Sequence, residues 1–292
     1  MYQFINDYPY FRENGLSHEC QGVCHDNDYW YFTQDGNIWK IPLSRDLNQK
    51  LDKDDPSIKF RKVGGHLGDL DYAQIGSTGY LFIPDMGNKS ETFISIWEAK
   101  NLRMVAKFPI YQNNQRFESI GWCAINNGYL YTSESTVGDR RYFVHIYKID
   151  FSRLNPFMNP CGRLLLLDEA GNHLTLKDMQ GGCFDNENHL HLANGYWENE
   201  DRDKQGIHIF EVQAEPSQLV QNVKRISKSN QKSGFKYKFD TSGQEPEGIT
   251  WWDLDNDSRA PAKERGQLHV ILLDNDPGGT DDLVFKHFRR TK

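Results

Sequence analysis

The stretch Glu19-Cys20-Gln21-Gly22-Val23 begins a pattern that recurs four more times along the 292 residues. In each copy a polar or acidic residue precedes a glycine, and a short apolar strand follows. A turn rich in Asn, Asp or Gly then leads to a second, aromatic-rich strand. Self-similarity over tens of residues is typical of propellers and other repeat folds. The other copies begin at Gly65-His66-Leu67-Gly68-Asp69, Glu118-Ser119-Ile120-Gly121-Trp122, Asp178-Met179-Gln180-Gly181-Gly182 and Glu245-Pro246-Glu247-Gly248-Ile249.

Five copies with lengthening loops predict an all-β fold, a five-bladed β-propeller with four antiparallel strands per blade. Apolar and polar residues alternate with a period of two in the second and third strands, as expected for strands packed between neighbouring blades. The fourth strands are less regular, and the Lys- and Ser-rich stretch 224–232 is predicted to be a solvated loop. The predicted second strands are 29–32, 79–82, 128–131, 189–192 and 268–271; the third are 38–41, 94–97, 144–147, 207–210 and 283–286; the fourth are 58–63, 103–108, 163–167 and 235–239.

The two ends of the chain complete one another in this scheme. The fifth copy ends after its third strand, whereas residues 2–5 form a strand-like segment with no copy of their own. We therefore expect the N-terminal strand to pair with 283–286 and close the last blade, which removes a free sheet edge. The chain shows no linker or shift in composition, so residues 1–292 are predicted to form a single β-propeller domain.

Composition excludes several classes of partner. The net charge of -7 and the absence of a long basic stretch argue against nucleic acid. No run of 18 apolar residues could span a membrane, and the first residues do not resemble a signal peptide, so we expect a soluble monomer. The five cysteines lack zinc spacing, and their odd number favours free thiols in a reducing compartment such as the cytoplasm.

Acidic residues converge on one face of this predicted ring. Loops that enter the innermost strands open on the same face as loops that join second to third strands. Four of the five residues that stand three positions before the repeat glycine are carboxylates. Crowded carboxylates have raised pKa values or bind a cation, and Ca²⁺ prefers many oxygen ligands. The alternative is that these side chains cap strand ends. The predicted metal ligands are Glu19, Glu118, Asp178, Glu245 and Glu247.

The second copy departs from the other four. It carries His66 in place of Cys, Ser, Met or Pro, and it adds Asp69 directly after the repeat glycine. We interpret His66 as a general base that Asp69 orients, with Glu118 or Glu247 as the acid or a metal ligand. The alternative is a structural, hydrogen-bonded histidine.

Further polar and aromatic residues fall at the same face and are predicted to contact a ligand. Aromatic rings there could stack on a sugar, although Trp122 also suits a core position between blades. The predicted ligand-binding residues are Gln21, Gln180, Trp122, Asn194, Tyr196, Trp197, Glu134 and Asp85.

The repeat starts, above all Glu245-Pro246-Glu247-Gly248-Ile249, resemble those of five-bladed propellers built around a central calcium, such as the calcium-activated apyrase nucleotidases. The resemblance covers the whole architecture but only a few residues per blade. It implies Ca²⁺ ligands drawn from Glu19, His66, Glu118, Ser119, Asp178 and Glu247. Similar Pro-Glu-Gly segments occur in lactonase-like and phytase-like propellers, so the resemblance does not extend to apyrase activity.

Two functions follow from this reading. The first, which we favour, is an acid/base enzyme of hydrolase type that acts on a small polar substrate in a cation-containing central funnel. The second is a lectin-like propeller that binds a glycan or a protein without catalysis. An enzyme predicts one asymmetric central site, as the second copy indicates, whereas a lectin predicts equivalent sites between blades.

Overall fold

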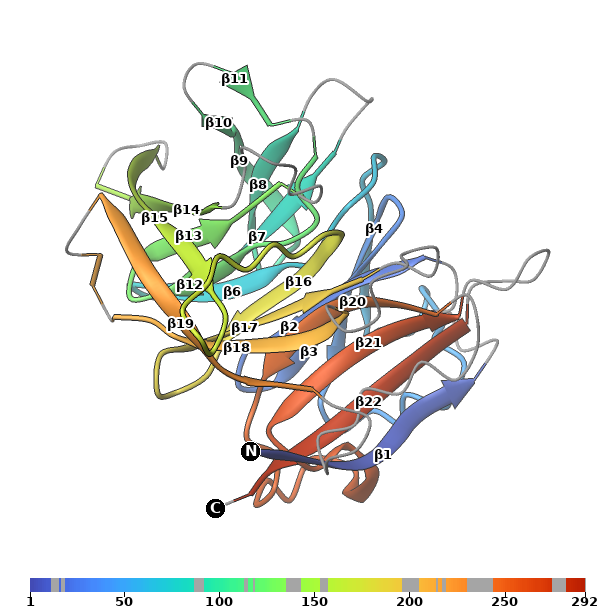
Figure 1. Ribbon diagram of the computed structural model, residues 1–292. Coiled ribbons are helices and arrows are strands. Elements are labelled where there is room, and N and C mark those ends of the chain that lie inside the picture. Colours follow the sequence, from blue (N-terminus) through green and yellow to red (C-terminus); the bar gives the residue numbers. More distant parts are fainter. Residues whose placement is uncertain are drawn as a thin grey trace.

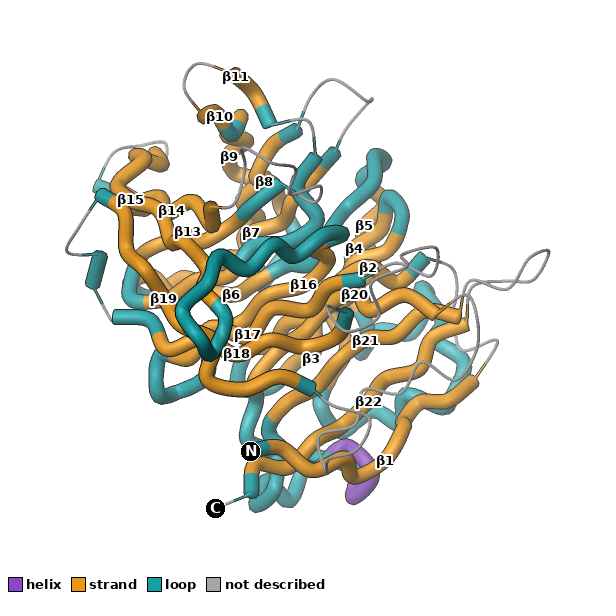
Figure 2. The backbone as a smooth tube through the Cα atoms, in the orientation of Figure 1, coloured by secondary structure: helices purple, strands orange, loops and turns teal. Residues whose placement is uncertain are grey.

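Strands make up nearly all regular structure in the computed structural model (Figure 2). It describes residues 1–11, 16, 19–86, 92–112, 115–117, 119–134, 143–152, 157–195, 205–213, 215–216, 219–229, 244–274 and 282–291. Within these ranges the one helix is the short 3-10 turn η2, Ala262–Glu264, and no helix is long and apolar enough to cross a membrane.

The strands form five four-stranded antiparallel blades, which confirms the predicted fold. Blade one contains β2 (Cys20–His25), β3 (Tyr29–Gln34), β4 (Asn37–Pro42) and β5 (Lys59–Lys62). Blade two contains β6 (Asp71–Ile75), β7 (Thr78–Asp85), β8 (Phe93–Glu98) and β9 (Arg103–Pro109). Blade three contains β12 (Ala124–Asn126), β13 (Tyr129–Thr132), β14 (Phe143–Asp150) and β15 (Phe157–Leu167). Blade four contains β16 (Met179–Phe184), β17 (His189–Asn194), β18 (Gly206–Glu211) and β19 (Val220–Lys228). Blade five contains β20 (Gln244–Trp251), β21 (Leu268–Asp274), β22 (Asp282–Arg290) and β1 (Tyr2–Phe11).

The first strand of the chain closes the last blade, as predicted. β1 lies antiparallel to β22, and both termini end at the same side of the molecule (Figure 1). The register pairs Tyr2 with Arg290 and Phe11 with Leu283. The predicted partner segment 283–286 therefore faces residues 7–11, and residues 2–4 face 288–290, because β1 extends beyond the predicted end at residue 5.

The outer strands of blades three and four join these blades into one eight-stranded sheet. β15 and β19 pair in parallel, from Arg163 opposite Val220 to Leu167 opposite Lys224. This pairing covers two strand edges that would otherwise face solvent. A small hairpin, β10 (Tyr111–Gln112) with β11 (Gln115–Arg116), follows blade two.

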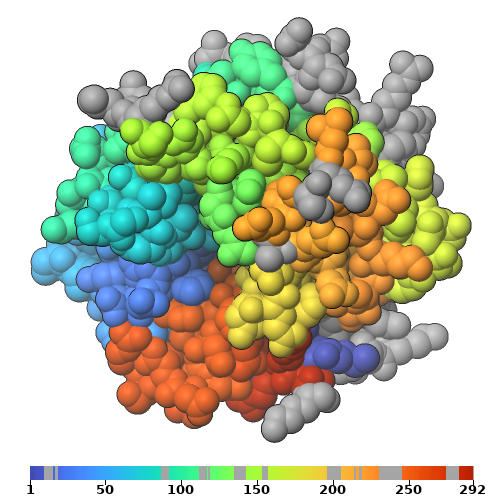
Figure 3. Space-filling view, turned by 90° about the vertical axis from the view of Figure 1, so that its left-hand side faces the viewer, coloured from blue at the N-terminus to red at the C-terminus, as the bar shows by residue number. Residues whose placement is uncertain are grey.

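The repeat glycines bring the five innermost strands into backbone contact. A Cβ added at Gly68 would lie 2.3 Å from the carbonyl oxygen of Gly121, and one at Gly248 would lie 2.6 Å from the Cα of Gly22. No residue with a side chain fits at such distances, which explains the glycines. The contacts run from blade to blade in chain order, and Figure 3 shows the colours following the same order around the visible face. The other contacts of this ring are Gly22 with Asp69, Gly121 with Met179 and Gly181 with Glu247.

The outer strand of blade four was predicted wrongly. The predicted loop 224–232 begins inside β19, and the predicted strand 235–239 lies outside the described residues. Burial alternates along β19, but the buried positions include Gln221 and Arg225, whereas Ile226 is 49% exposed. Arg225 is paired with Glu169 at 2.7 Å, which makes its burial tolerable. Two of the three inward positions are thus polar, and the usual alternation of apolar inward and polar outward residues does not identify this strand.

Candidate functional site

Asp69 lies on the propeller axis and hydrogen-bonds to strands of three other blades. Its Oδ1 accepts the N–H of Val23 at 3.0 Å, and its Oδ2 accepts those of Gly182 at 3.0 Å and Ile249 at 3.1 Å. Its own N–H donates to the carbonyl of Gly121 in blade three at 2.7 Å. Val23, Gly182 and Ile249 each follow the repeat glycine of their blade, as Asp69 does, so one carboxyl group ties together equivalent positions around the ring.

This arrangement corrects the predicted role of Asp69. The side chain is fully buried, and burial raises its pKa while the three N–H donors act in the opposite sense. His66 is half-buried, and its Nδ1 lies 3.5 Å from Oδ1 of Asp35, the residue after β3. Asp69 therefore holds the innermost strands together and does not orient His66, and Asp35 is the carboxylate beside that ring. The sequence offered a signal for Asp35, since it stands in a loop between second and third strands.

Four repeat starts meet at a cavity of about 190 Å³ at the mouth of the ring. In blades one, two and four a backbone bond joins the repeat start to the residue after the second strand: Asp35 N–H to Glu19 O, Met86 N–H to His66 O and Gly195 N–H to Asp178 O. The cavity is small beside the roughly 300–1,000 Å³ of typical drug-sized ligand sites, so it fits one small polar molecule. Its lining residues are His66, Met86, Ser119, Gly121, Asp178, Gln180 and Glu245.

A carboxylate pair shares one amide at this cavity. Nε2 of Gln180 donates to Oε1 of Glu245 at 2.5 Å and lies 3.3 Å from Oε1 of Glu247. Glu245 lines the cavity, and Glu247 is 2% exposed behind it. Burial, followed by the charges of Glu245, Glu19 and Asp69, raises the pKa of Glu247 well above its ordinary value. Glu247 is therefore harder to ionise than an isolated carboxyl group.

Backbone conformation at the repeat start is unusual in three blades. Glu19 and Asp178 have φ angles of 56° and 53°, in the left-handed region that side chains rarely adopt. Gly65 occupies the same position in blade two with φ 86°, a conformation that glycine adopts without strain. Non-glycine residues in this region are strained, and such strain is often found at ligand sites. Asp178 combines this backbone with a place in the cavity wall.

The remaining predicted residues are distributed unevenly. Trp122 is completely buried; its Nε1 donates to Oγ of Ser133, and its ring packs against Gly182, as in a core position. Asn194 is buried and donates to the carbonyl of Lys177, and Asp85 pairs with Lys107 at 2.9 Å. Three predicted residues, Glu118, Tyr196 and Trp197, lie outside the described part of the chain.

The last two predicted ligand-binding residues are Gln21 and Glu134, and the predicted calcium ion needs a group of ligands. Nε2 of Gln21 lies 3.3 Å from Oε2 of Glu19, and Glu134 is buried at the end of the second strand of blade three. Among the residues that the structure describes, no three His, Cys, Asp or Glu side chains are grouped so as to hold a metal ion. Calcium binding therefore stays a prediction.

Comparison with known proteins gives a fold and no family. No family model matches the chain, and no curated protein matches it. Among solved structures it is similar to RS223-Beta-xylosidase, with a TM-score of 0.55 and 9% identity over 97% of this chain and 95% of that one. It is also similar to the GH43_1 enzyme from Xanthomonas citri complexed with xylose, with a TM-score of 0.54 and 10% identity over 97% and 89%. Myxococcus xanthus glutaminyl cyclase follows, with a TM-score of 0.52 and 12% identity over 100% and 97%. At such identities the likeness supports the propeller fold alone.

Proposed function

We propose that the cavity at the mouth of the propeller is the active site of a hydrolase that cleaves a glycosidic bond in a small carbohydrate. This proposal rests on the group of carboxyl side chains there. Asp178 and Glu245 line the cavity, and the buried Glu247 accepts from the same side-chain amide, that of Gln180, as Glu245 does. Glycoside hydrolysis uses two carboxyl groups, one as the acid and one as the base or nucleophile. Two structures with this fold, a beta-xylosidase and an enzyme complexed with xylose, support a carbohydrate substrate.

Glu245 is the proposed acid. It shares Gln180 with Glu247, whose pKa burial and neighbouring charges raise, and it is the member of the pair that lines the cavity, so we assign the catalytic proton to it. That proton passes to the glycosidic oxygen as its bond to the anomeric carbon breaks, and the leaving group departs as an alcohol. Asp178 takes a proton from the water whose hydroxyl adds to the anomeric carbon, which balances the reaction. His66 is placed to hydrogen-bond sugar hydroxyls.

A panel of chromogenic substrates tests this proposal. Glycosides of single pentoses and hexoses, in both anomeric forms, should release the chromophore, whereas its carboxylic and phosphate esters should not. The double variant Asp178→Asn/Glu245→Gln should lose turnover on the best glycoside by about 10²–10⁴-fold. The matched control Asp54→Asn/Glu211→Gln changes the same residue types at exposed positions and should retain full turnover.

Binding measurements separate the outcomes. If a monosaccharide binds the wild-type protein and the double variant weakens it, but no glycoside is cleaved, the lectin-like propeller is the better description. If esters are cleaved in place of glycosides, the reaction class is wrong. If the double variant and its control cleave glycosides equally fast, the cavity is not the active site.

A further inference from the structure

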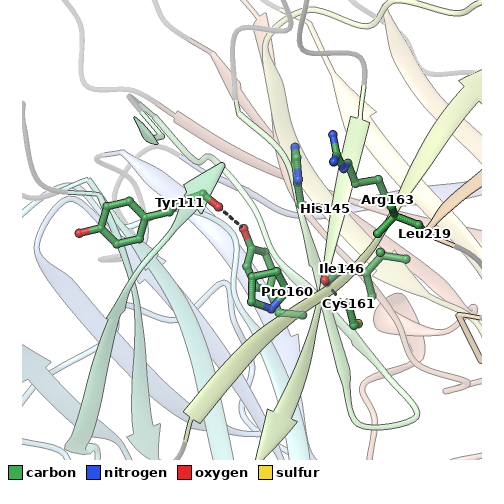
Figure 4. Close-up of a pocket in the computed structure, with 9 residues that line it drawn as sticks. Tyr111, His145, Ile146, Pro160, Cys161, Arg163 and Leu219 are labelled. Atoms are coloured by element: carbon green, nitrogen blue, oxygen red, sulfur yellow. Dashed lines mark hydrogen bonds between the residues drawn. The ribbon is translucent and has the colours of Figure 1, made fainter. Parts of the chain in front are cut away.

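A second cavity, of about 160 Å³, lies on blade three (Figure 4). β14 and β15 form its base, Tyr111 of β10 stands at one side, and Leu219, which precedes β19, stands at another. None of its lining residues lines the first cavity. The two cavities are therefore separate.

A β-bulge shapes this cavity. The pairing of β14 with β15 passes from Ile146 opposite Gly162 to Tyr147 opposite Pro160, so Cys161 is the extra residue. Bulges bend a strand and redirect its side chains, and they are often found beside functional sites. Next to the bulge, His145 and Arg163 are direct cross-strand partners, so their side chains share one face of the sheet, as Figure 4 shows.

His145 carries ring nitrogens that no protein group satisfies within the described part of the chain. The residue is 7% exposed and lines the cavity, and the rings of Phe117 and Phe143 lie at centroid distances of 4.9 and 6.4 Å from its own ring. Burial, and then the charge of Arg163, lower the pKa of His145 to about 4, so the ring is neutral at pH 7. Its ring nitrogens are not among the completely buried polar atoms that lack a partner, so they stay accessible to a molecule in the cavity. A neutral imidazole facing a cavity points to a partner that enters from outside.

Arg163 supplies a positive charge beside this ring. Its guanidinium lies over the ring of Phe143 at 5.2 Å from the centroid, and it forms no ion pair with any described residue. The Arg163 backbone is fixed, because its N–H donates to the carbonyl of Leu219 at 3.0 Å. A planar guanidinium offers two parallel N–H donors, which match a carboxylate. The walls beyond it include apolar side chains, since Pro160 and Leu219 line the cavity.

We propose that the blade-three cavity, defined by Tyr111, His145, Pro160, Arg163 and Leu219, binds a small organic carboxylate. The guanidinium of Arg163 binds the carboxylate oxygens, and an N–H of His145 donates to the same group. The apolar part of the ligand packs against Pro160 and Leu219. The site is independent of hydrolysis at the first cavity, so the two proposals can fail separately.

Benzoate is a suitable probe, and calorimetry at fixed ionic strength is a suitable assay. Benzoate should bind at one site and shift the ring NMR signals of His145, whereas benzamide, its neutral analogue, should bind at least tenfold more weakly. Acetate should also bind more weakly, because it lacks the apolar part. Arg163→Met should lower benzoate affinity at least tenfold, and Arg163→Lys, which retains the charge without the planar donor pair, should lower it less.

Matched variants make the test decisive. Arg61→Met removes an exposed arginine from blade one and should leave benzoate affinity unchanged, as should Asp178→Asn/Glu245→Gln at the first cavity. The proposal is overturned if benzamide binds as tightly as benzoate, or if Arg163→Met and Arg61→Met bind benzoate equally well while their melting temperatures match the wild type. It is also overturned if inorganic phosphate displaces benzoate at equal concentration, since the site would then select charge alone.

Discussion

Replacing Asp69 with alanine should weaken the whole ring rather than one blade. The substitution removes the acceptor of three buried N–H groups, those of Val23, Gly182 and Ile249, on strands of three different blades. Each buried donor left without a partner costs about 1–3 kcal/mol. Burial of the carboxyl group is itself unfavourable, since it raises the pKa of Asp69, and its removal offsets part of this loss. We therefore expect Asp69→Ala to lower the free energy of unfolding by about 3–5 kcal/mol.

Asp69→Asn provides an internal comparison. Oδ2 accepts two of the three bonds, so an asparagine whose oxygen takes that place loses only the bond from Val23. Its expected loss is about 1–3 kcal/mol, smaller than that of alanine. The exposed control Asp54→Ala should change stability by less than about 0.5 kcal/mol. Urea denaturation of the four proteins, followed by tryptophan fluorescence and circular dichroism, measures these differences. Equal stability of Asp69→Ala and Asp54→Ala would refute the view that Asp69 ties the blades together.

Three further predictions concern the blade closure, a buried acid and the ion. Deletion of residues 1–11 removes β1 and exposes β22, so the melting temperature should fall sharply; an unchanged value would contradict the closure. Burial raises the pKa of Glu264 from 4.5 to about 8, so the folded state binds more protons than the unfolded state between these two pH values. The free energy of unfolding should therefore decrease as pH rises from 4.5 to 8, by up to about 1.4 kcal/mol per pH unit. Glu264→Gln retains an acceptor for Trp30 and should remove this pH dependence, measured by urea titrations at pH 5–8. The same pH dependence in both proteins would show that Glu264 does not cause it. If calcium binds at the mouth, a concentration of one hundred times its dissociation constant should stabilise the protein by roughly 2.7 kcal/mol. Glu247→Gln should weaken that stabilisation. Identical melting curves with calcium and with chelator would refute a calcium site.

The repeat glycines explain why the architecture was predictable from sequence. Each of them stands where two innermost strands touch, and no other residue fits, so a steric requirement repeated five times leaves a visible pattern. The incomplete fifth copy and the unassigned first residues predicted the closure by the same logic. β19 lacks such a requirement. Its inward Arg225 is stabilised by Glu169, a partner that a local pattern of polarity does not reveal.

The convergence of four repeat starts on one cavity was predictable from sequence, but the pairings of their side chains were not. Spacing along the repeat placed His66, Asp178, Gln180 and Glu245 at one mouth, because equivalent positions in blades converge. It did not reveal that Asp69 points to three backbone amides, since those amides come from residues 46, 113 and 180 positions away in the chain. The blade-three cavity depends on the bulge at Cys161, which the sequence does not mark.

A crystal structure of the Glu245→Gln variant with the sugar of its best glycoside tests the proposed site most directly. We predict the sugar in the cavity of His66, Asp178 and Gln180, with one oxygen within hydrogen-bond distance of residue 245 and its anomeric carbon facing Asp178. A sugar bound only elsewhere, between the outer strands of two blades or in the blade-three cavity, would contradict a hydrolase site at the mouth of the propeller.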